Sequence, residues 1–145
     1  MEQKDERKKV LLFICTHNSA RSQMAEGFLK TLYPDSYGAF SAGTEPSGVN
    51  PYALQIMAEI GIDISSHRSK SVNEFLDKEI DYVVTVCDLA RQTCPFFPVG
   101  KETMHKGFED PAAFNGSEDD KLAVFRRVRD EIRTWIEETL GKEGE

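Results

Sequence analysis

The fold is decided by the stretch Cys15-Thr16-His17-Asn18-Ser19-Ala20-Arg21-Ser22. An apolar, β-forming run over residues 10–14 precedes it, and a helix-like stretch from Arg21 to about Tyr33 follows it. A strand, a tight loop and a helix in this order create an anion site, because unpaired N–H donors and the positive end of the helix dipole meet there. The same field favours the thiolate of Cys15, which is the nucleophilic form of a cysteine. We therefore predict that residues 15–22, called here the oxyanion loop, bind an oxyanion beside a reactive thiol.

The length of the chain indicates how many domains it forms, and its charge argues against some classes of binding partner. With 145 residues, of which 39% are hydrophobic, residues 1–145 are expected to form a single domain. A net charge of −7 argues against binding to nucleic acid or to an anionic membrane. No apolar run is long enough to span a membrane, and residues 1–8 look like a flexible tail without a signal peptide's apolar segment. We therefore expect a cytoplasmic protein, and its acidic, amphipathic character predicts a monomer.

Strand-like and helix-like segments alternate along the rest of the chain. Beyond residues 10–14, β-forming runs predict strands at Ala39–Gly43, Ile80–Val86 and, at an edge, Met104–Phe108. Capping residues and apolar spacing predict helices that begin after Asn50, Ser71 and Ser117. This alternation predicts an α/β fold with a doubly wound, open four-stranded parallel sheet flanked by helices.

An oxyanion in the loop has several predicted ligands and one predicted attacking group. The Arg21 guanidinium can hold two oxygens at once, and Cys15 is placed to attack the central atom. Ser22 can hydrogen-bond the thiolate, although a helix-cap hydroxyl is an equally good interpretation, as an αL turn residue is for Asn18. Asp110 is the predicted acid that protonates a leaving oxygen, with a simple turn residue as the alternative. The predicted oxyanion ligands are Thr16, His17, Asn18, Ser19, Ala20, Arg21 and Ser22.

The three cysteines fit neither a disulfide framework nor a zinc site. Cys87 follows the strand at Ile80–Val86 as Cys15 follows the first strand, so the two thiols can share the carboxyl edge of the sheet. Cys94 lies beyond Cys87 by about 23 Å in an extended chain or about 10.5 Å along a helix, whereas a disulfide needs Cα atoms within about 7 Å. If these two cysteines pair, the chain between them must loop. Two buried, small apolar residues are the alternative.

Residues 15–27 resemble the phosphate-binding loop of the low-molecular-weight protein tyrosine phosphatase fold and, within it, that of the thioredoxin-coupled arsenate reductases. The similarity runs from about Val10 to Trp135, and the presence of Cys87 and Cys94 makes it specific for the reductases. It rests on the motifs Ser41-Ala42-Gly43, Gly48-Val49-Asn50-Pro51, Gly61-Ile62-Asp63-Ile64-Ser65, Val83-Val84-Thr85-Val86-Cys87, Cys94-Pro95, Gly107-Phe108-Glu109-Asp110-Pro111 and Arg126-Arg127-Val128-Arg129-Asp130-Glu131-Ile132.

The resemblance implies reduction of arsenate to arsenite, for arsenic detoxification, by a relay of three cysteines without a cofactor. Cys15 forms a thiol–arsenate adduct while Asp110 protonates the departing oxygen. Cys87 then attacks Cys15, two electrons pass to arsenic, and arsenite leaves. Cys94 attacks Cys87 and moves the disulfide outward, where thioredoxin reduces it by thiol–disulfide exchange.

Two positions depart from the usual pattern of the family. Some members hold a potassium ion beside the loop with groups that correspond here to Asn18, Glu26, Ser41 and Lys70, and an acid is usual at the last position. The Lys70 ammonium can take the place of the cation, so we expect weak or absent potassium dependence. Ala20 stands where several relatives carry a further cysteine outside the relay, so catalysis is expected not to need that thiol.

The three histidines carry little information. His17 lies in the oxyanion loop and is expected to face solvent. His67 and His105 have no partner at the spacing of metal ligands, so we expect both to lie at the surface or to be partly packed. No metal site is predicted apart from a weak potassium site.

Two other functions stay open at the level of the sequence. A phosphatase that acts on tyrosine phosphate or a small phosphate ester needs Cys15, Arg21 and Asp110 but neither of the other thiols. Such phosphatases usually place tyrosines after the Asp-Pro pair to stack the substrate ring, whereas Ala112 and Ala113 stand there. A thiol redox sensor or an arsenite-binding module is the non-catalytic alternative, and neither needs the oxyanion loop with an acid.

Overall fold

The computed structural model describes residues 8–88 and 102–141 of the chain. Parallel strands form one sheet in the order β2-β1-β3-β4. The strands are β1 (Lys9–Cys15), β2 (Tyr37–Gly43), β3 (Tyr82–Thr85) and β4 (Glu102–His105). The helices are α1 (Arg21–Leu32), α2 (Pro51–Glu59) and α4 (Glu118–Thr139), and the short 3-10 turns are η1 (Val72–Phe75) and η2 (Pro111–Ala113). The predicted open four-stranded parallel sheet flanked by helices is confirmed.

The strand β1 lies in the middle of the sheet and organises it. It pairs with β2 on one side and with β3 on the other. Residues 11–15 are buried, which explains why this run is continuously apolar instead of alternating. Since the strands are parallel, Cys15 at the end of β1 and Cys87 just beyond β3 reach the same edge of the sheet.

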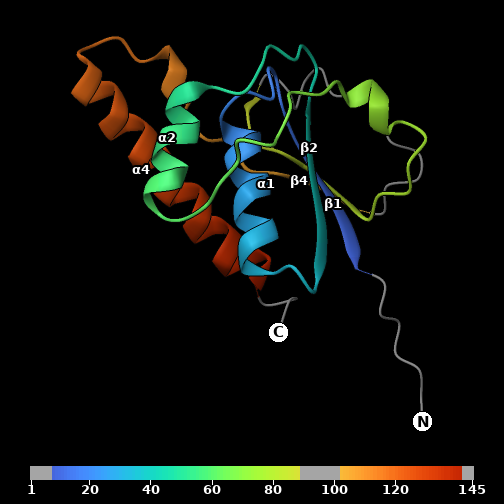
Figure 1. Cartoon of the computed structure of the whole chain (residues 1–145). Helices are drawn as coiled ribbons and strands as arrows, with labels where there is room; N and C mark the ends of the chain where they lie inside the picture. The colour runs from blue at the N-terminus through green and yellow to red at the C-terminus, as the bar shows by residue number, and fades with distance from the viewer. Residues whose placement is uncertain (1–7, 89–101, 142–145) are drawn as a thin grey trace.

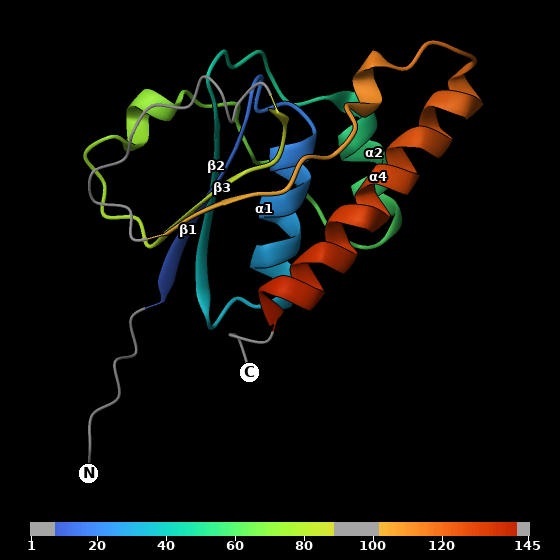
Figure 2. The same ribbon diagram turned by 180° about the vertical axis from the view of Figure 1, so that it is seen from behind.

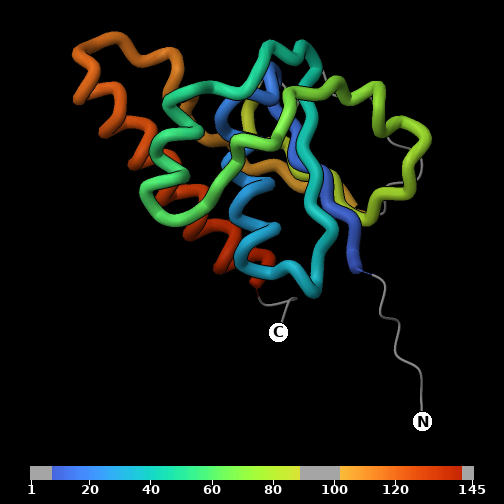
Figure 3. Tube along the Cα trace, in the orientation of Figure 1, coloured from blue at the N-terminus to red at the C-terminus, as the bar shows by residue number. Residues whose placement is uncertain are grey.

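The three α-helices lie on one face of the sheet, and η1 lies on the other (Figures 1 and 2). The helix α1 packs against β1, β2 and α4, and α4 also contacts α2. In Figure 3 the oxyanion loop and the segment that follows β2 lie side by side at one end of the sheet. Within residues 8–88 and 102–141, no helix is both long enough and apolar enough to cross a membrane.

The bounds of all four strands differ from the prediction. β1 extends one residue beyond the predicted run 10–14 at each end, and β3 spans Tyr82–Thr85 instead of Ile80–Val86. β2 begins at Tyr37 instead of Ala39, because Tyr37 is buried and its hydroxyl donates to the Leu140 carbonyl oxygen at 3.0 Å. The turn-forming residues around Tyr37 predicted a loop there, and the contact with Leu140, which is distant in the sequence, could not be predicted. β4 was predicted at Met104–Phe108 but spans Glu102–His105. The chain after β4 still donates backbone hydrogen bonds to β3 and to the residue that follows it, which keeps it close to Cys87.

The N-termini of the helices differ in whether a side chain caps them, and this difference affects the oxyanion loop. The predicted caps of α2 and α4 are confirmed, since Asn50 accepts a hydrogen bond from the Tyr52 N–H and Ser117 accepts one from the Asp120 N–H. The helix α1 differs, because its N-cap residue is Ala20, which offers no side-chain acceptor. The N-terminal donors of α1 are therefore not capped by a side chain and are available to an anion.

Candidate active site

The oxyanion loop leaves β1 at Cys15 and enters α1 at Arg21. Its turn depends on Asn18, which adopts a left-handed conformation with φ of 49°. Gly43, at the end of β2, lies against the loop. A Cβ atom at Gly43 would lie 2.7 Å from the Thr16 carbonyl oxygen and 2.8 Å from the Asn18 nitrogen. Glycine is therefore required there for the strand and the loop to approach.

The carbonyl groups of the loop are tied to the segment that follows β2. The backbone hydrogen bonds run from Thr44 to Cys15, from Glu45 to Thr16, from Ser47 to His17 and from Asn50 to Ser19. The backbone N–H groups of residues 16–20 make no backbone hydrogen bond to another described residue. With its carbonyls held by the neighbouring segment, the loop leaves its N–H donors available to an anion.

The Cys15 thiol lies at one end of a directed hydrogen-bond chain. The Sγ of Cys15 is 2.9 Å from Ser22 Oγ, and the Asn18 side-chain amide donates to the same hydroxyl oxygen at 2.7 Å. Because an amide nitrogen only donates, Ser22 accepts from Asn18 and keeps its own hydrogen for the sulfur. All three side chains are buried. This direction of hydrogen bonding gives the Cys15 sulfur a hydrogen-bond donor.

This chain of hydrogen bonds continues through Gln23 to His67. The Gln23 amide nitrogen donates to Asn18 Oδ1 at 3.0 Å, and Gln23 Oε1 is 2.9 Å from His67 Nδ1, which therefore carries a hydrogen. The expectation that His67 is at the surface or partly packed holds only in its second part, since its side chain is 8% exposed. Burial lowers the pKa of His67, and the nearby Glu26 carboxylate opposes that shift. The sequence did not single out Gln23, which is fully buried.

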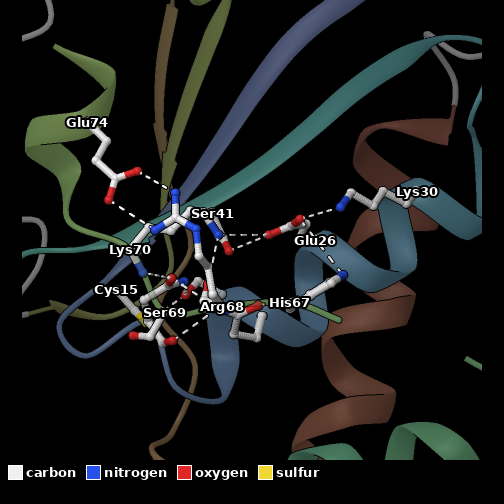
Figure 4. Close-up of polar contacts among 12 residues, drawn as sticks. Cys15, Glu26, Lys30, Ser41, His67, Arg68, Ser69, Lys70 and Glu74 are labelled. Atoms are coloured by element: carbon white, nitrogen blue, oxygen red, sulfur yellow. Dashed lines mark hydrogen bonds and ion pairs between the residues drawn. The ribbon is translucent and has the colours of Figure 1, made fainter. Parts of the chain in front are cut away.

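Glu26 lies among groups that leave little room for a potassium ion. Its carboxylate accepts a hydrogen bond from Ser41 Oγ, and the Lys30 and Lys70 ammonium nitrogens lie 2.6 and 3.9 Å from its oxygens (Figure 4). Asn18 Oδ1 already accepts from Gln23 and from the Lys70 backbone N–H. These donors occupy the oxygens that would bind the ion, so the residues present do not fit potassium. Burial lowers the pKa of Lys70, and Glu26 acts against that shift.

The partly buried His67 gives a prediction about stability and pH. Its folded-state pKa lies below its ordinary value of about 6.5, so the unfolded chain takes up a proton first as the pH falls. The free energy of unfolding is therefore expected to decrease below about pH 6.5 and to stop responding to this group below the folded pKa. A His67→Gln variant removes this contribution. Urea unfolding of both proteins from pH 7.5 to pH 5 should give a shallower pH dependence for the variant, and parallel curves would contradict this.

Arg21 and Asp110 face one another across the mouth of the loop. Arg21 donates to the Phe108 carbonyl oxygen at 3.1 Å, and its other terminal nitrogen is 3.6 Å from Asp110 Oδ2. Asp110 Oδ1 caps η2 by accepting from the Ala112 N–H at 3.0 Å. The second carboxylate oxygen, Oδ2, is thus the one that faces Arg21 and can exchange a proton with a bound group.

Two adjoining cavities share His17, Arg21 and Asp110 in their walls. The cavity beside Cys15 has a volume of about 160 Å³, and the one beside Cys87 has a volume of about 340 Å³. The exposed His17 is anchored by a 3.0 Å hydrogen bond from Nδ1 to the Glu45 carbonyl oxygen. The structure therefore places Cys15 and Cys87 in the walls of two cavities that share Arg21 and Asp110.

Cys87 is buried and lies against the oxyanion loop. Its Sγ is 3.4 Å from Thr16 Oγ1, within reach of a hydrogen bond to sulfur. The Thr16 hydroxyl therefore contacts the second thiol, a role that the sequence did not suggest. Cys94, the third predicted member of the relay, lies outside the described residues. Among the described residues there is no cluster of three or more His, Cys, Asp or Glu side chains that could hold a metal ion.

Comparisons with known proteins agree with this geometry. The profile of the low molecular weight phosphotyrosine protein phosphatase family matches residues 10–144. An arsenate reductase of Halalkalibacterium halodurans is 52% identical over 125 residues, which cover 86% of this chain and 90% of that protein. A solved arsenate reductase in the oxidised state matches with a TM-score of 0.79 and 34% identity, over 92% of this chain and 98% of the other.

A second solved structure is of a reductase named for its reductant. The thioredoxin-dependent arsenate reductase of Corynebacterium glutamicum matches with a TM-score of 0.67 and 26% identity, over 97% of this chain and 64% of that chain. The family profile spans residues 10–144, and the alignment with the Halalkalibacterium halodurans protein covers 86% of the chain. The chain therefore belongs to the low molecular weight phosphotyrosine protein phosphatase family and, within it, to the arsenate reductases.

Proposed function

We propose that this protein reduces arsenate to arsenite. Cys15 is the nucleophile that attacks arsenic, and Cys87 is the second nucleophile, which attacks the Cys15 sulfur and forms a disulfide with it. The observation that carries the proposal is the placement of Cys87, whose thiol lies against the oxyanion loop and lines the cavity that also contains Arg21 and Asp110. A phosphatase needs no second thiol there. The named relatives support the substrate, since they are arsenate reductases.

The chemistry follows from the positions of the groups. Arsenate binds to the N–H groups of the loop and to Arg21, and the Cys15 thiolate attacks arsenic while Asp110 protonates the oxygen that leaves as water. Cys87 then attacks the sulfur of Cys15. The S–S bond forms, the S–As bond breaks, and its electron pair stays on arsenic, which leaves as arsenite.

The oxidised protein must then be reduced, and thioredoxin is the proposed reductant. The support is the resemblance to a thioredoxin-dependent reductase and the presence of Cys94 in the sequence. In the proposed relay Cys94 takes over the disulfide from Cys15 by attacking Cys87, and thioredoxin reduces the resulting bond. A monomeric, cytoplasmic enzyme remains our expectation.

A direct assay separates reduction from hydrolysis. We expect arsenate to cause oxidation of reduced thioredoxin in the presence of catalytic amounts of this protein, with one arsenite formed per thioredoxin oxidised. Hydrolysis of para-nitrophenyl phosphate should be far slower, because the exposed Ala112 and Ala113 in η2 offer no ring platform. Rapid ester hydrolysis without arsenate reduction would support the phosphatase alternative instead.

The packing around Glu26 predicts indifference to potassium. Because the Lys30 and Lys70 ammonium groups already compensate this carboxylate, replacing sodium by potassium should leave the rate of arsenate reduction and the midpoint of thermal unfolding unchanged. Both are measured at constant ionic strength, so that general screening does not differ between the salts. Strong activation by potassium would contradict the fit described above.

A further inference from the structure

A second row of hydrogen-bonded side chains lies beside Cys87, and the reaction described above does not use it. Thr85 and His105 end β3 and β4 and are register partners in the sheet. Thr85 Oγ1 is 2.8 Å from His105 Nδ1, and His105 Nε2 is 2.8 Å from Asp88 Oδ1. Asp88 immediately follows Cys87 in the chain, so the row connects the second thiol to the edge strand of the sheet.

The donors and acceptors of this row are mutually consistent. A carboxylate only accepts hydrogen bonds, so the hydrogen between Asp88 and His105 belongs to Nε2. The Nδ1 of a neutral imidazole is then an acceptor, and the Thr85 hydroxyl can donate to it at 2.8 Å in preference to the Met104 carbonyl oxygen at 3.4 Å. The buried Thr85 thereby fixes the orientation of the His105 ring, which in turn fixes the Asp88 carboxylate.

Gly107 supplies independent evidence that the structure makes room for this pair. A Cβ atom at Gly107 would lie 2.8 Å from Asp88 Oδ1 and 3.4 Å from His105 Nε2. The glycine does not have a positive φ, so backbone conformation does not require it. The space it leaves is filled by the Asp88 carboxylate in contact with His105.

The pair restrains Cys87 from its C-terminal side. On the N-terminal side, Val86 is fixed by backbone hydrogen bonds, since its N–H donates to Ile14 and its carbonyl accepts from Phe108. Asp88 is the residue on the other side; its side chain is 84% exposed, and within residues 8–88 and 102–141 its carboxylate is hydrogen-bonded to His105. With both neighbours held, the backbone at Cys87 is restrained, and its thiol lies 3.4 Å from Thr16 Oγ1.

We propose that the Asp88–His105 pair, oriented by Thr85 and accommodated by Gly107, is a positioning device that holds Cys87 for attack on Cys15. The inference rests on the proposed role of Cys87 as second nucleophile. Attack on sulfur requires an aligned approach at close distance, and small misplacements of a reacting group cost large factors in rate. Asp88 and His105 act through Cys87 and touch no reacting atom in this account.

Single-turnover kinetics test the proposal. Pre-reduced protein is mixed with saturating arsenate, and arsenite release is followed in Asp88→Ala, His105→Phe and Gly107→Ala variants. Each should release arsenite at least about tenfold more slowly than the unchanged protein, because Cys87 is no longer aligned. Asp88→Asn, which keeps an acceptor for His105, should restore the rate. Asp119→Ala, which removes an exposed carboxylate in the first turn of α4, is the matched control and should have no effect.

Two further readouts separate positioning from other causes. Alkylation of Cys15 by iodoacetamide should proceed at the normal rate in all these variants, since the cavity beside Cys15 is lined by neither Asp88 nor His105. If Asp88 acted only through its charge near the anion cavity, Asp88→Ala and Asp88→Asn would behave alike and lower the arsenate concentration that gives half the maximal rate. That result, or normal arsenite release in Asp88→Ala and Gly107→Ala, would overturn the proposal.

The same experiment includes Cys87→Ser, which distinguishes failure of the positioning proposal from failure of the proposed function. If Cys87→Ser releases no arsenite while Asp88→Ala matches the unchanged protein, the positioning device is refuted and the proposed function stands. If Cys87→Ser releases arsenite at the normal rate, the proposed function fails, and the positioning device is refuted with it.

Discussion

A Cys87→Ser variant is expected to release no arsenite in a single turnover, although it should still bind arsenate and form the adduct with Cys15. Without the second thiol no group can attack the Cys15 sulfur and leave the electron pair of the S–As bond on arsenic. A serine hydroxyl at this buried position cannot form an equivalent bond to sulfur. Quenched samples analysed for arsenite over time give the measurement.

The matched variant for this prediction is Cys94→Ser. It should release arsenite in the first turnover and then stop, because Cys94 acts after the arsenic has left. A phosphatase would be indifferent to both changes. Normal first-turnover release by Cys87→Ser would therefore contradict the assignment of the second thiol, whatever Cys94→Ser does.

An Arg21→Lys variant should lose about a hundredfold or more in kcat/KM for arsenate, as the loss of one donor to a developing oxyanion does in other enzymes. Lysine keeps the positive charge but cannot replace the planar fork, which holds two oxygens and also donates to the Phe108 carbonyl. Steady-state rates over a range of arsenate concentrations give the value.

The control for Arg21→Lys is Arg133→Lys, at an exposed position on α4 where arginine pairs with Glu137 one turn away. That change should leave kcat/KM unaltered, because the pair is at the surface and far from the oxyanion loop in the chain. A loss of less than about threefold in Arg21→Lys would mean that charge alone, and not the bidentate geometry, holds the oxyanion.

The oxyanion loop could be predicted from the sequence because its determinants are local. A buried β-run, eight loop residues and a helix follow one another without a break, so the direction of the backbone donors and the positions of Cys15, Ser22 and Arg21 follow from adjacency. The parallel arrangement of the strands then brings Cys87 to the same edge. Both features are present in the structure.

The polar network behind the loop could not be predicted because its members meet only in three dimensions. Gln23 and His67 are 44 positions apart, and neither belongs to a spacing pattern. The structure shows that Gln23 is fully buried, with its amide shared between Asn18 and the Arg68 carbonyl. No rule of composition or periodicity identifies such a residue.

The same limit applies on the other side of the site. Asp88 and His105 are 17 positions apart, and each alone is an ordinary polar residue. Their contact depends on the register between β3 and β4, and the sequence placed β4 two residues too far along the chain. The observed register also explains the glycine at position 107, because a Cβ atom there would lie too close to the Asp88 carboxylate.

The most direct test of the account is to identify the disulfide formed in one turnover. Pre-reduced Cys94→Ser protein is treated with one equivalent of arsenate, digested without reductant and analysed by mass spectrometry. We expect one arsenite per protein and a cross-linked peptide pair joining Cys15 to Cys87. Arsenite release with both thiols still reduced, or with Cys15 joined to any partner other than Cys87, would contradict it.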